Sequence, residues 1–185
     1  AVAAPAALAK KPWEKFDIPE LNEIKMPAYE RVELDNGMIL YLAEDHKFPL
    51  VELSATIDVG SIYEPADKVG LASMTGSVMR TGGTTKRSGD ELDELVEARG
   101  LSVETWIGDS NGGAYLSAMK EDTDLGLELL ADILRNPAFP EDKIKLAKEE
   151  QKAGISRRND EPTGIARREA MKAVFGADHP LARHT

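Results

Sequence analysis

Three positions in one stretch of the chain, Ser73, Gly76 and Ser77, have the spacing at which a helix can bind a metal. The sequence predicts one buried helix over residues 69–80, and side chains three and four residues apart on a helix lie on one face. The three positions are therefore spaced like the two histidines and the glutamate of a zinc-binding His-x-x-Glu-His helix. Their residue types do not suit that chemistry. A serine hydroxyl is a poor zinc ligand beside imidazole, and glycine has no side chain to act as a base.

The serines and histidines could also belong to other kinds of site. To act as a nucleophile, Ser73 or Ser77 would need a nearby general base, usually histidine, and none lies in the neighbouring predicted elements. The histidines are His46, His179 and His184. A His-rich metal site would need all three to converge from distant parts of the chain, so we expect them to be surface or loop residues.

Two further patterns have structural explanations. Residues 111–113, Asn-Gly-Gly, could suggest a phosphate-binding loop, but the lysine and the strand-to-helix context of such a loop are missing, and a hairpin turn explains them. Four arginines form a basic cluster near predicted helix ends: Arg157, Arg158, Arg167 and Arg168. We interpret this cluster as a solvated face or a complement to helix dipoles, and a docking patch for an acidic partner stays open.

The composition is that of a folded, acidic domain. The 185 residues are close to the size of one domain, and a chain of this length buries about 70% of its unfolded surface. The net charge of −10 argues against nucleic acid or an anionic membrane surface as a partner, whereas a basic substrate is compatible. The absence of cysteine excludes disulfides and thiolate metal sites. No run of about 18 apolar residues occurs, so we predict no membrane span.

The hydrophobic pattern predicts the elements that must position these residues. Alternation predicts strands at 29–34, 38–42, 50–59, 101–107 and 114–119, helical periodicity predicts helices at 69–80, 88–100, 125–134, 140–158 and 163–174, and residues 60–68 and 176–185 are predicted loops. The turn at residues 35–37, Asp-Asn-Gly, joins the first two strands. Ser88 and Glu91 form a capping box at the start of the second helix.

This order of elements indicates an α+β fold, in which helices pack on one face of an antiparallel sheet. We expect residues 1–27 to form an extended arm or linker and residues 28–185 to form the domain. The small side chains of the first nine residues are typical of the end of a secretory leader or of the linker after one, with a plain Ala/Pro linker as the alternative. The last connection, with His179 before Pro180, looks unfinished, and we expect the domain to continue past residue 185.

Several short motifs, in order along the chain, carry a resemblance to a known family. They are Leu34-Asp-Asn-Gly-Met-Ile-Leu-Tyr-Leu42, Glu44-Asp-His-Lys-Phe-Pro-Leu-Val51, Gly60-Ser-Ile-Tyr-Glu-Pro65, Gly70-Leu-Ala72, Gly82-Gly-Thr84 with Arg87-Ser88, Glu91-Leu92, and Leu130-Ala-Asp-Ile-Leu-Arg-Asn-Pro-Ala-Phe139. Over about residues 28–184 the chain resembles the N-terminal half of an M16 peptidase subunit, a family that includes insulin-degrading enzyme, pitrilysin and the mitochondrial processing peptidase. The resemblance implies a domain that the family uses twice per subunit, with the two halves facing each other across a chamber.

The resemblance also implies where a zinc site would lie. In active members the helix after Gly-Leu-Ala carries two histidines that bind zinc and a glutamate that activates the attacking water. The histidine positions fall on Ser73 and Ser77, and the glutamate position falls on Gly76. Neither zinc binding nor base catalysis is expected from these residues.

The third zinc ligand of active members is a glutamate on the long helix before an Asp-x-Pro end. Anchoring on Asp160 and Pro162 puts Gly154 at or next to that position, whereas Glu149 and Glu150 lie about one turn too early. Every site position is therefore expected to be degenerate. We expect no zinc and no other cofactor in this chain, and no activity of the chain alone.

The resemblance and these losses together indicate a non-catalytic role. Some M16 peptidases are heterodimers in which one subunit keeps the zinc site, while its homologous partner lacks it and helps to form the chamber that holds an extended peptide. We interpret the chain as the N-terminal domain of such a partner, acting with a zinc-bearing M16 subunit, a peptide substrate and the C-terminal half of its own full-length chain. Two alternatives stay open: a structural or assembly subunit, as in the respiratory bc1 complex, and an active zinc peptidase with unorthodox ligands. We expect a periplasmic or otherwise exported location, with the cytoplasm as the alternative.

Overall fold

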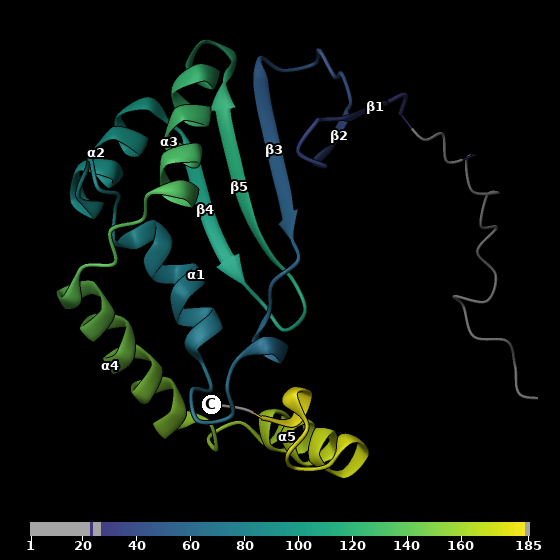
Figure 1. Ribbon diagram of the computed structural model, residues 1–185, viewed down its shortest axis with the longest axis vertical. Helices are drawn as coiled ribbons and strands as arrows, with labels where there is room; N and C mark the ends of the chain where they lie inside the picture. Colours follow the sequence, from purple (N-terminus) through teal and green to yellow (C-terminus); the bar gives the residue numbers. More distant parts are fainter. Residues whose placement is uncertain (1–22, 24–26, 184–185) are drawn as a thin grey trace, which may run out of the picture. The chain divides into compact units, whose positions relative to one another are not determined.

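A computed structural model describes Glu23 and residues 27–183 (Figure 1). The chain divides into two compact units, Ala1–Lys47 and Phe48–Thr185, and each is described by itself. The arm predicted for residues 1–27 lies almost entirely outside the described residues, as does His184. The domain boundary predicted at residue 27 therefore stays a prediction.

The described part of the first unit is a β-hairpin. Strands β1 (Glu30–Glu33) and β2 (Ile39–Leu42) pair in antiparallel orientation, as predicted. The turn between them has Gly37 at φ 83°, in the left-handed region that glycine adopts readily. The side-chain oxygen of Asn36 accepts a 3.0 Å hydrogen bond from the Met38 amide, which fixes the turn.

The second unit is built on a three-stranded antiparallel sheet. Its strands are β3 (Leu50–Ile57), β4 (Ser102–Ile107) and β5 (Gly112–Met119), in the order β3-β5-β4. β4 therefore lies at one edge of the sheet and β3 at the other. β3 ends two residues before the predicted end.

β5 begins at Gly112, two residues earlier than predicted, because Trp106 of β4 pairs with Gly113. A side chain at residue 113 would collide with the indole ring, so the glycine lets the two strands pair over their full length. The connection of residues 108–111 is a tight hairpin in which the Gly108 amide donates a 2.8 Å hydrogen bond to the Asn111 carbonyl. The hairpin explanation of the Asn-Gly-Gly run is confirmed, although the two glycines belong to the strand.

Five α-helices lie in the described part of the second unit, close to their predicted positions: α1 (Leu71–Thr81), α2 (Gly89–Arg99), α3 (Thr123–Arg135), α4 (Glu141–Arg157) and α5 (Pro162–Phe175). The capping box of Ser88 and Glu91 forms at the start of α2. The segments predicted as plain loops contain short 3₁₀ turns at Ser61–Tyr63 and Pro180–Ala182. At the first of these turns the Ser61 amide donates to the Gly108 carbonyl of the β4–β5 hairpin.

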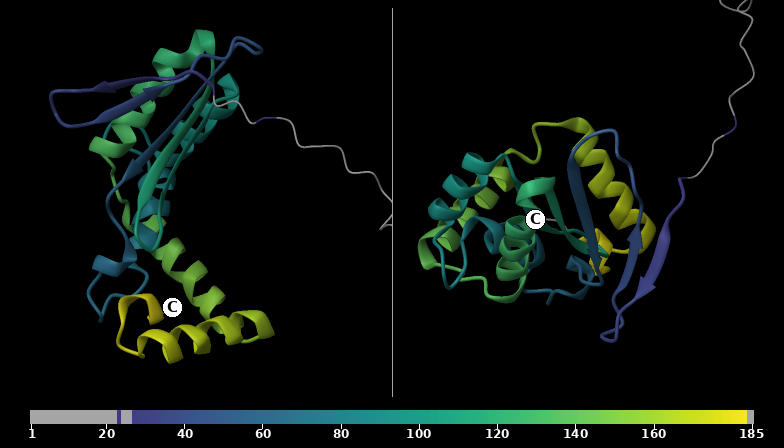
Figure 2. Two further views of the ribbon diagram at one scale, coloured as in Figure 1. Left: turned by 90° about the vertical axis from the view of Figure 1, so that its right-hand side faces the viewer. Right: turned by 90° about the horizontal axis from the view of Figure 1, so that it is seen from above.

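α2 and α3 cover one face of the sheet, which confirms the predicted α+β arrangement (Figures 1 and 2). Along β5, Ala114, Leu116 and Ala118 are buried, whereas Tyr115 and Ser117 between them are partly exposed on the other face. The buried core contains Leu92, Val96, Leu101, Val103, Ala114, Leu116, Ala118, Leu129, Leu130 and Ile133. The core therefore sits between the sheet and these two helices.

α4 and α5 differ from the helices of the core. Neither contains a buried residue, although α4 runs beside α1 (Figure 1). None of the helices in the described part of the chain is both long and apolar enough to cross a membrane.

Candidate functional site

The sequence predicted that the helix carrying the candidate site is buried. In the structure this helix, α1, is only half buried. It lies beside the edge strand β4, so only its inner side is covered (Figure 1). Its buried residues are Ala72, Gly76, Val78 and Arg80, and its exposed residues are Leu71, Ser73, Ser77 and Thr81. The predicted site positions therefore fall on both sides of the helix.

The start of α1 is fixed by a side chain from the preceding loop. The Glu64 carboxylate accepts hydrogen bonds of 3.0 Å from the backbone amides of Gly70 and Ala72. Free amides at a helix start carry partial positive charge, so a carboxylate there stabilises the helix. Glu64 thereby anchors the helix that presents the two serines.

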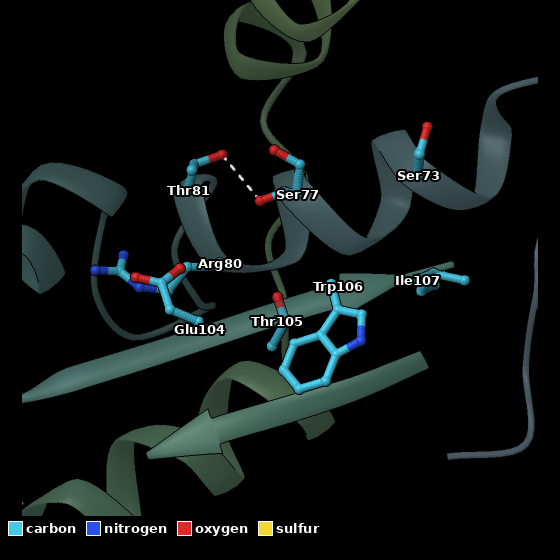
Figure 3. A pocket seen from close by; sticks show the side chains of 8 residues that line it. All are labelled: Ser73, Ser77, Arg80, Thr81, Glu104, Thr105, Trp106 and Ile107. Carbon is cyan, nitrogen blue, oxygen red and sulfur yellow. Dashed lines mark hydrogen bonds between the residues drawn. The ribbon is translucent and has the colours of Figure 1, made fainter. Parts of the chain in front are cut away.

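A pocket of about 260 Å³ lies between α1 and β4. It is lined by Ser73, Ser77, Arg80 and Thr81 of α1 and by Glu104, Thr105, Trp106 and Ile107 of β4 (Figure 3). The structure thus places both predicted serines in one pocket, on the same side of α1, as their four-residue spacing requires.

Two of the pocket hydroxyls are engaged with the backbone of their own helix. Ser73 Oγ donates to the Gly70 carbonyl at 3.2 Å, and Thr81 Oγ1 donates to the Ser77 carbonyl at 3.1 Å (Figure 3). Such bonds leave the oxygen lone pairs free to accept from a ligand. Together with the Glu104 carboxylate, these oxygens give the pocket wall hydrogen-bond acceptors beside the cationic side chain of Arg80.

Gly76 lies beneath this pocket, against the backbone of β4. Its carbonyl accepts a 2.7 Å hydrogen bond from the buried hydroxyl of Thr105. A Cβ at this position would lie within 3.0 Å of the backbone nitrogen of Ile107 and 2.8 Å from the carbonyl carbon of Trp106. Non-bonded carbon atoms normally approach to about 3.5 Å, so helix and strand are closer here than any side chain permits.

Arg80 forms a second close contact between α1 and β4. Its Nε donates a 2.6 Å hydrogen bond to the Val103 carbonyl, and its Nη1 lies 2.8 Å from a carboxylate oxygen of Asp93 on α2. The Arg80 side chain is only 9% exposed, and the geometry at Nη1 is that of an ion pair without an aligned hydrogen bond. Arg80 therefore ties the end of α1 to the strand and to the next helix.

The position predicted for the third zinc ligand lies on α4. Gly154 is exposed there, and a Cβ added to it would meet no atom within 4 Å. Glu149 and Glu150 are also exposed, and Glu149 pairs with Lys152 at 2.8 Å. None of these residues lines the pocket between α1 and β4.

The residues at the predicted positions do not fit zinc. The positions of the two histidines hold neutral hydroxyls, and the space that the glutamate side chain would need is filled by the β4 backbone. Within residues 27–183, no group of three or more His, Cys, Asp or Glu side chains is placed to hold a metal ion. We therefore derive no catalytic step through zinc.

The two described histidines, His46 and His179, lie outside the pocket. His46 is an exposed residue of the first unit that lies 3.3 Å from a Glu44 oxygen, whereas His179 accepts a hydrogen bond from the Leu181 amide at the start of a 3₁₀ turn. Neither lines the pocket that contains the serines, so among the described residues a serine nucleophile has no histidine base there.

Three arginines of the basic cluster, Arg157, Arg158 and Arg167, are exposed, and Arg168 is half-buried. Arg168 donates to the carbonyl of Arg158, and so joins the middle of α5 to the end of α4. This bond accounts for one arginine as a structural residue.

The sequence did not identify the β4 residues of the pocket. The alternation of Thr105 and Trp106 predicted a strand, and Glu104 was one polar residue among many. These residues could have been found only from the strand order, because it is the pairing of β4 with β5 that makes β4 the edge strand next to α1.

Comparison with known proteins assigns this geometry to one family. The family model described as insulinase, peptidase family M16, matches residues 40–185. A solved structure from Pseudomonas fluorescens, described as a peptidase M16 inactive domain, has the same fold with a TM-score of 0.75 and 20% sequence identity, over 84% of this chain and 38% of that chain.

Two curated proteins show the likeness in sequence. The chain is 28% identical over 120 residues to subunit 1 of the mitochondrial cytochrome b-c1 complex of Bos taurus. This match covers 65% of this chain and 25% of that protein. It is 30% identical over 173 residues to the alpha subunit of the mitochondrial-processing peptidase of Solanum tuberosum, covering 89% of this chain and 33% of that protein. The chain thus spans a quarter to a third of the length of these relatives.

Proposed function

Because the chain belongs to the insulinase family of peptidases, family M16, we propose that it is the N-terminal domain of a non-catalytic subunit in a heterodimeric peptidase. In this role it forms part of the wall of a peptide-binding chamber, together with the C-terminal half of its own full-length chain, while a homologous zinc-bearing subunit performs hydrolysis. The observation that carries the proposal is the replacement of the zinc motif by Ser73, Gly76 and Ser77 on an otherwise intact helix. The proposal includes no cofactor in this chain and an exported, periplasmic location.

The surface around the pocket supports a peptide ligand of basic character. Glu104 pairs with Tyr115 across β4 and β5, so both side chains lie on the face of the sheet opposite to the core. The Tyr115 hydroxyl donates a 2.8 Å hydrogen bond to Glu52 of β3, which raises the pKa of Tyr115. Two carboxylates therefore border this face in a chain of net charge −10, and such a surface attracts Lys and Arg side chains of an extended peptide.

The test is reconstitution with a zinc-bearing M16 partner. The native complex is purified, and cleavage of an unstructured basic peptide is compared for this chain alone, the partner alone and the two together. We expect cleavage to be strongest for the mixture, to stop with a chelator, and to be absent for this chain alone. Chelator-sensitive cleavage by this chain alone would contradict the proposal and favour an active peptidase with unorthodox ligands.

A pair of matched variants tests the pocket within that complex. Glu104→Gln removes a charge from the pocket, whereas Glu97→Gln removes one from the exposed outer side of α2. We expect the first variant to raise KM for a basic peptide several-fold with kcat unchanged, and the second to change neither. Equal effects of the two substitutions would show that the pocket does not contact the peptide.

The second candidate is a structural or assembly subunit with no role in proteolysis. It is favoured by the likeness to subunit 1 of the cytochrome b-c1 complex, which is 28% identical over 120 residues. In this case the chain would co-purify with partners, but its addition to a zinc-bearing homologue would leave the rate of peptide cleavage unchanged. The reconstitution assay therefore separates the two candidates.

A further inference from the structure

We propose that this domain requires glycine at residue 76 for the packing of α1 against β4. Restoring the glutamate of the zinc motif at this position would therefore not restore the site, because its side chain has no room. The assignment of Gly76 to the base position rests on the family resemblance used in the proposed function. The packing itself does not depend on that assignment. It is a property of the contact between α1 and β4.

The contact is formed by two connections that lie one helical turn apart. At the first, the Thr105 hydroxyl donates to the Gly76 carbonyl at 2.7 Å. At the second, Arg80 Nε donates to the Val103 carbonyl at 2.6 Å. Because both pairs are buried, α1 is held against the strand over the whole turn between them.

No flexible side chain could move aside to make room at residue 76. The atoms that a Cβ would meet within 3.0 Å are backbone atoms of Trp106 and Ile107. These residues belong to a strand that pairs with β5 along its full length. A side chain at residue 76 must therefore push α1 away from β4 and lengthen both buried hydrogen bonds.

The two serine positions behave differently, because Ser73 and Ser77 are exposed on the pocket side of the helix. Histidines at these positions would be four residues apart on one face, which suits joint binding of one metal ion. The pocket can therefore regain metal ligands, whereas the position of the base cannot regain a side chain. Of the three motif positions on α1, only residue 76 has no room for the side chain that the motif requires.

The experiment compares two identical substitutions by thermal unfolding of the full chain. Intrinsic helix propensity predicts that Gly→Ala stabilises a helix interior. We expect Gly154→Ala, where a Cβ meets nothing within 4 Å, to raise Tm by about 2–4 °C. We expect Gly76→Ala to lower Tm by roughly 5 °C or more, or to prevent folding altogether. A Gly76→Ala chain with an unchanged or raised Tm would overturn the proposal.

A second measurement holds even if Gly76→Ala does not fold. The double variant Ser73→His with Ser77→His should keep the Tm of the parent chain. It should also bind Zn²⁺ without a partner subunit, and calorimetry and histidine NMR shifts measure this binding. Addition of Gly76→Glu to this double variant should lower Tm by roughly 5 °C or more, or prevent folding. A triple variant that keeps the Tm of the double variant would overturn the proposal. Because no peptidase assay is used, this outcome is independent of the proposed function.

Discussion

Gly76 and Gly154 both stand where the family resemblance places a group of the zinc site, yet their surroundings are opposite. At Gly76 the backbone of β4 occupies the place of a side chain, whereas a Cβ at Gly154 would meet nothing within 4 Å. The comparison teaches that two glycines at predicted site positions can have different structural roles. One position has been absorbed into the packing, and the other has remained a plain exposed position on a helix.

The same difference extends to the elements that carry the two glycines. α1 packs against β4 and contacts α2 and α3, and these two helices contribute residues to the buried core. α4 and α5 have no buried residue. Parts of a protein with few buried apolar contacts open locally at a lower free-energy cost than the core does. We therefore expect residues 141–175 to exchange amide hydrogens faster than residues 89–135.

The largest expected effect compares one leucine from each region. Leu129 on α3 is fully buried, whereas Leu146 on α4 is 55% exposed. Leu129→Ala should lower the free energy of unfolding by about 3 kcal/mol, because it removes buried methyl groups and leaves a cavity. Leu146→Ala should lower it by less than about 1 kcal/mol. Both values come from urea denaturation, and similar losses for the two variants would remove the distinction between the regions.

The next effect compares two arginines that donate to backbone carbonyls. Arg80 on α1 bonds Val103 from a buried position, whereas Arg168 on α5 bonds Arg158 at the surface. Arg80→Met should cost about 2–3 kcal/mol of unfolding free energy, because a charged hydrogen bond out of solvent is lost. Arg168→Met should cost less than about 1 kcal/mol. The distinction fails if the surface arginine proves as costly to replace.

A smaller effect concerns the starts of two helices. Glu64 accepts from two amides at the start of α1, whereas Glu161 at the start of α5 makes no side-chain capping bond. Glu64→Gln should reduce stability by about 1 kcal/mol, because the amide has one acceptor oxygen and no charge. Glu161→Gln should change it little. Thermal unfolding of both variants measures the difference, and an equal change in Tm would show that Glu64 is not a cap in solution.

Local signals in the sequence predicted the elements of this fold but not the contacts between them. The capping box at Ser88 and the turn at Asn36 and Gly37 fixed two element boundaries, because both act within four residues. The contact of Gly76 with the β4 backbone could not be predicted, since it depends on how closely α1 approaches β4. The strand residues Gly112 and Gly113 were missed for the same kind of reason, because their pairing depends on β4, whose Trp106 indole lies against Gly113.

The candidate site was predictable only in the part that follows from helix geometry. The four-residue spacing of Ser73 and Ser77 predicts that they share one side of the helix, and both line the pocket. Glu104 and Trp106, which form the opposite wall, come from a strand whose neighbours are set by pairing between segments far apart in the sequence. The loss of zinc ligands could be predicted because a motif has fixed positions, whereas a surface without a motif gives no such signal.

The smallest expected effect compares two carboxylates by their response to pH and salt. Hydrogen bonds from Asn136 and Thr84 lower the pKa of Asp132, which is buried on α3, and a bond from Lys172 lowers the pKa of Glu169, which is exposed on α5. A folded-state pKa below the unfolded value means that the group stabilises the fold above the unfolded pKa, which is about 3.9 for Asp and about 4.3 for Glu. This stabilisation is lost as the pH falls through the lower, folded-state pKa.

Asp132→Asn and Glu169→Gln remove these two groups. We expect each difference in unfolding free energy from the parent chain to shrink as the pH falls from 6 toward 2, because the parent loses the same interaction by protonation. At neutral pH, high salt should abolish the difference for Glu169, whose pair is screened, and should leave most of that for Asp132, whose side chain is 3% exposed. Urea denaturation across pH at low and high salt measures both. If the two carboxylates respond alike to salt, α3 and α5 do not differ in burial as the rest of the comparison requires.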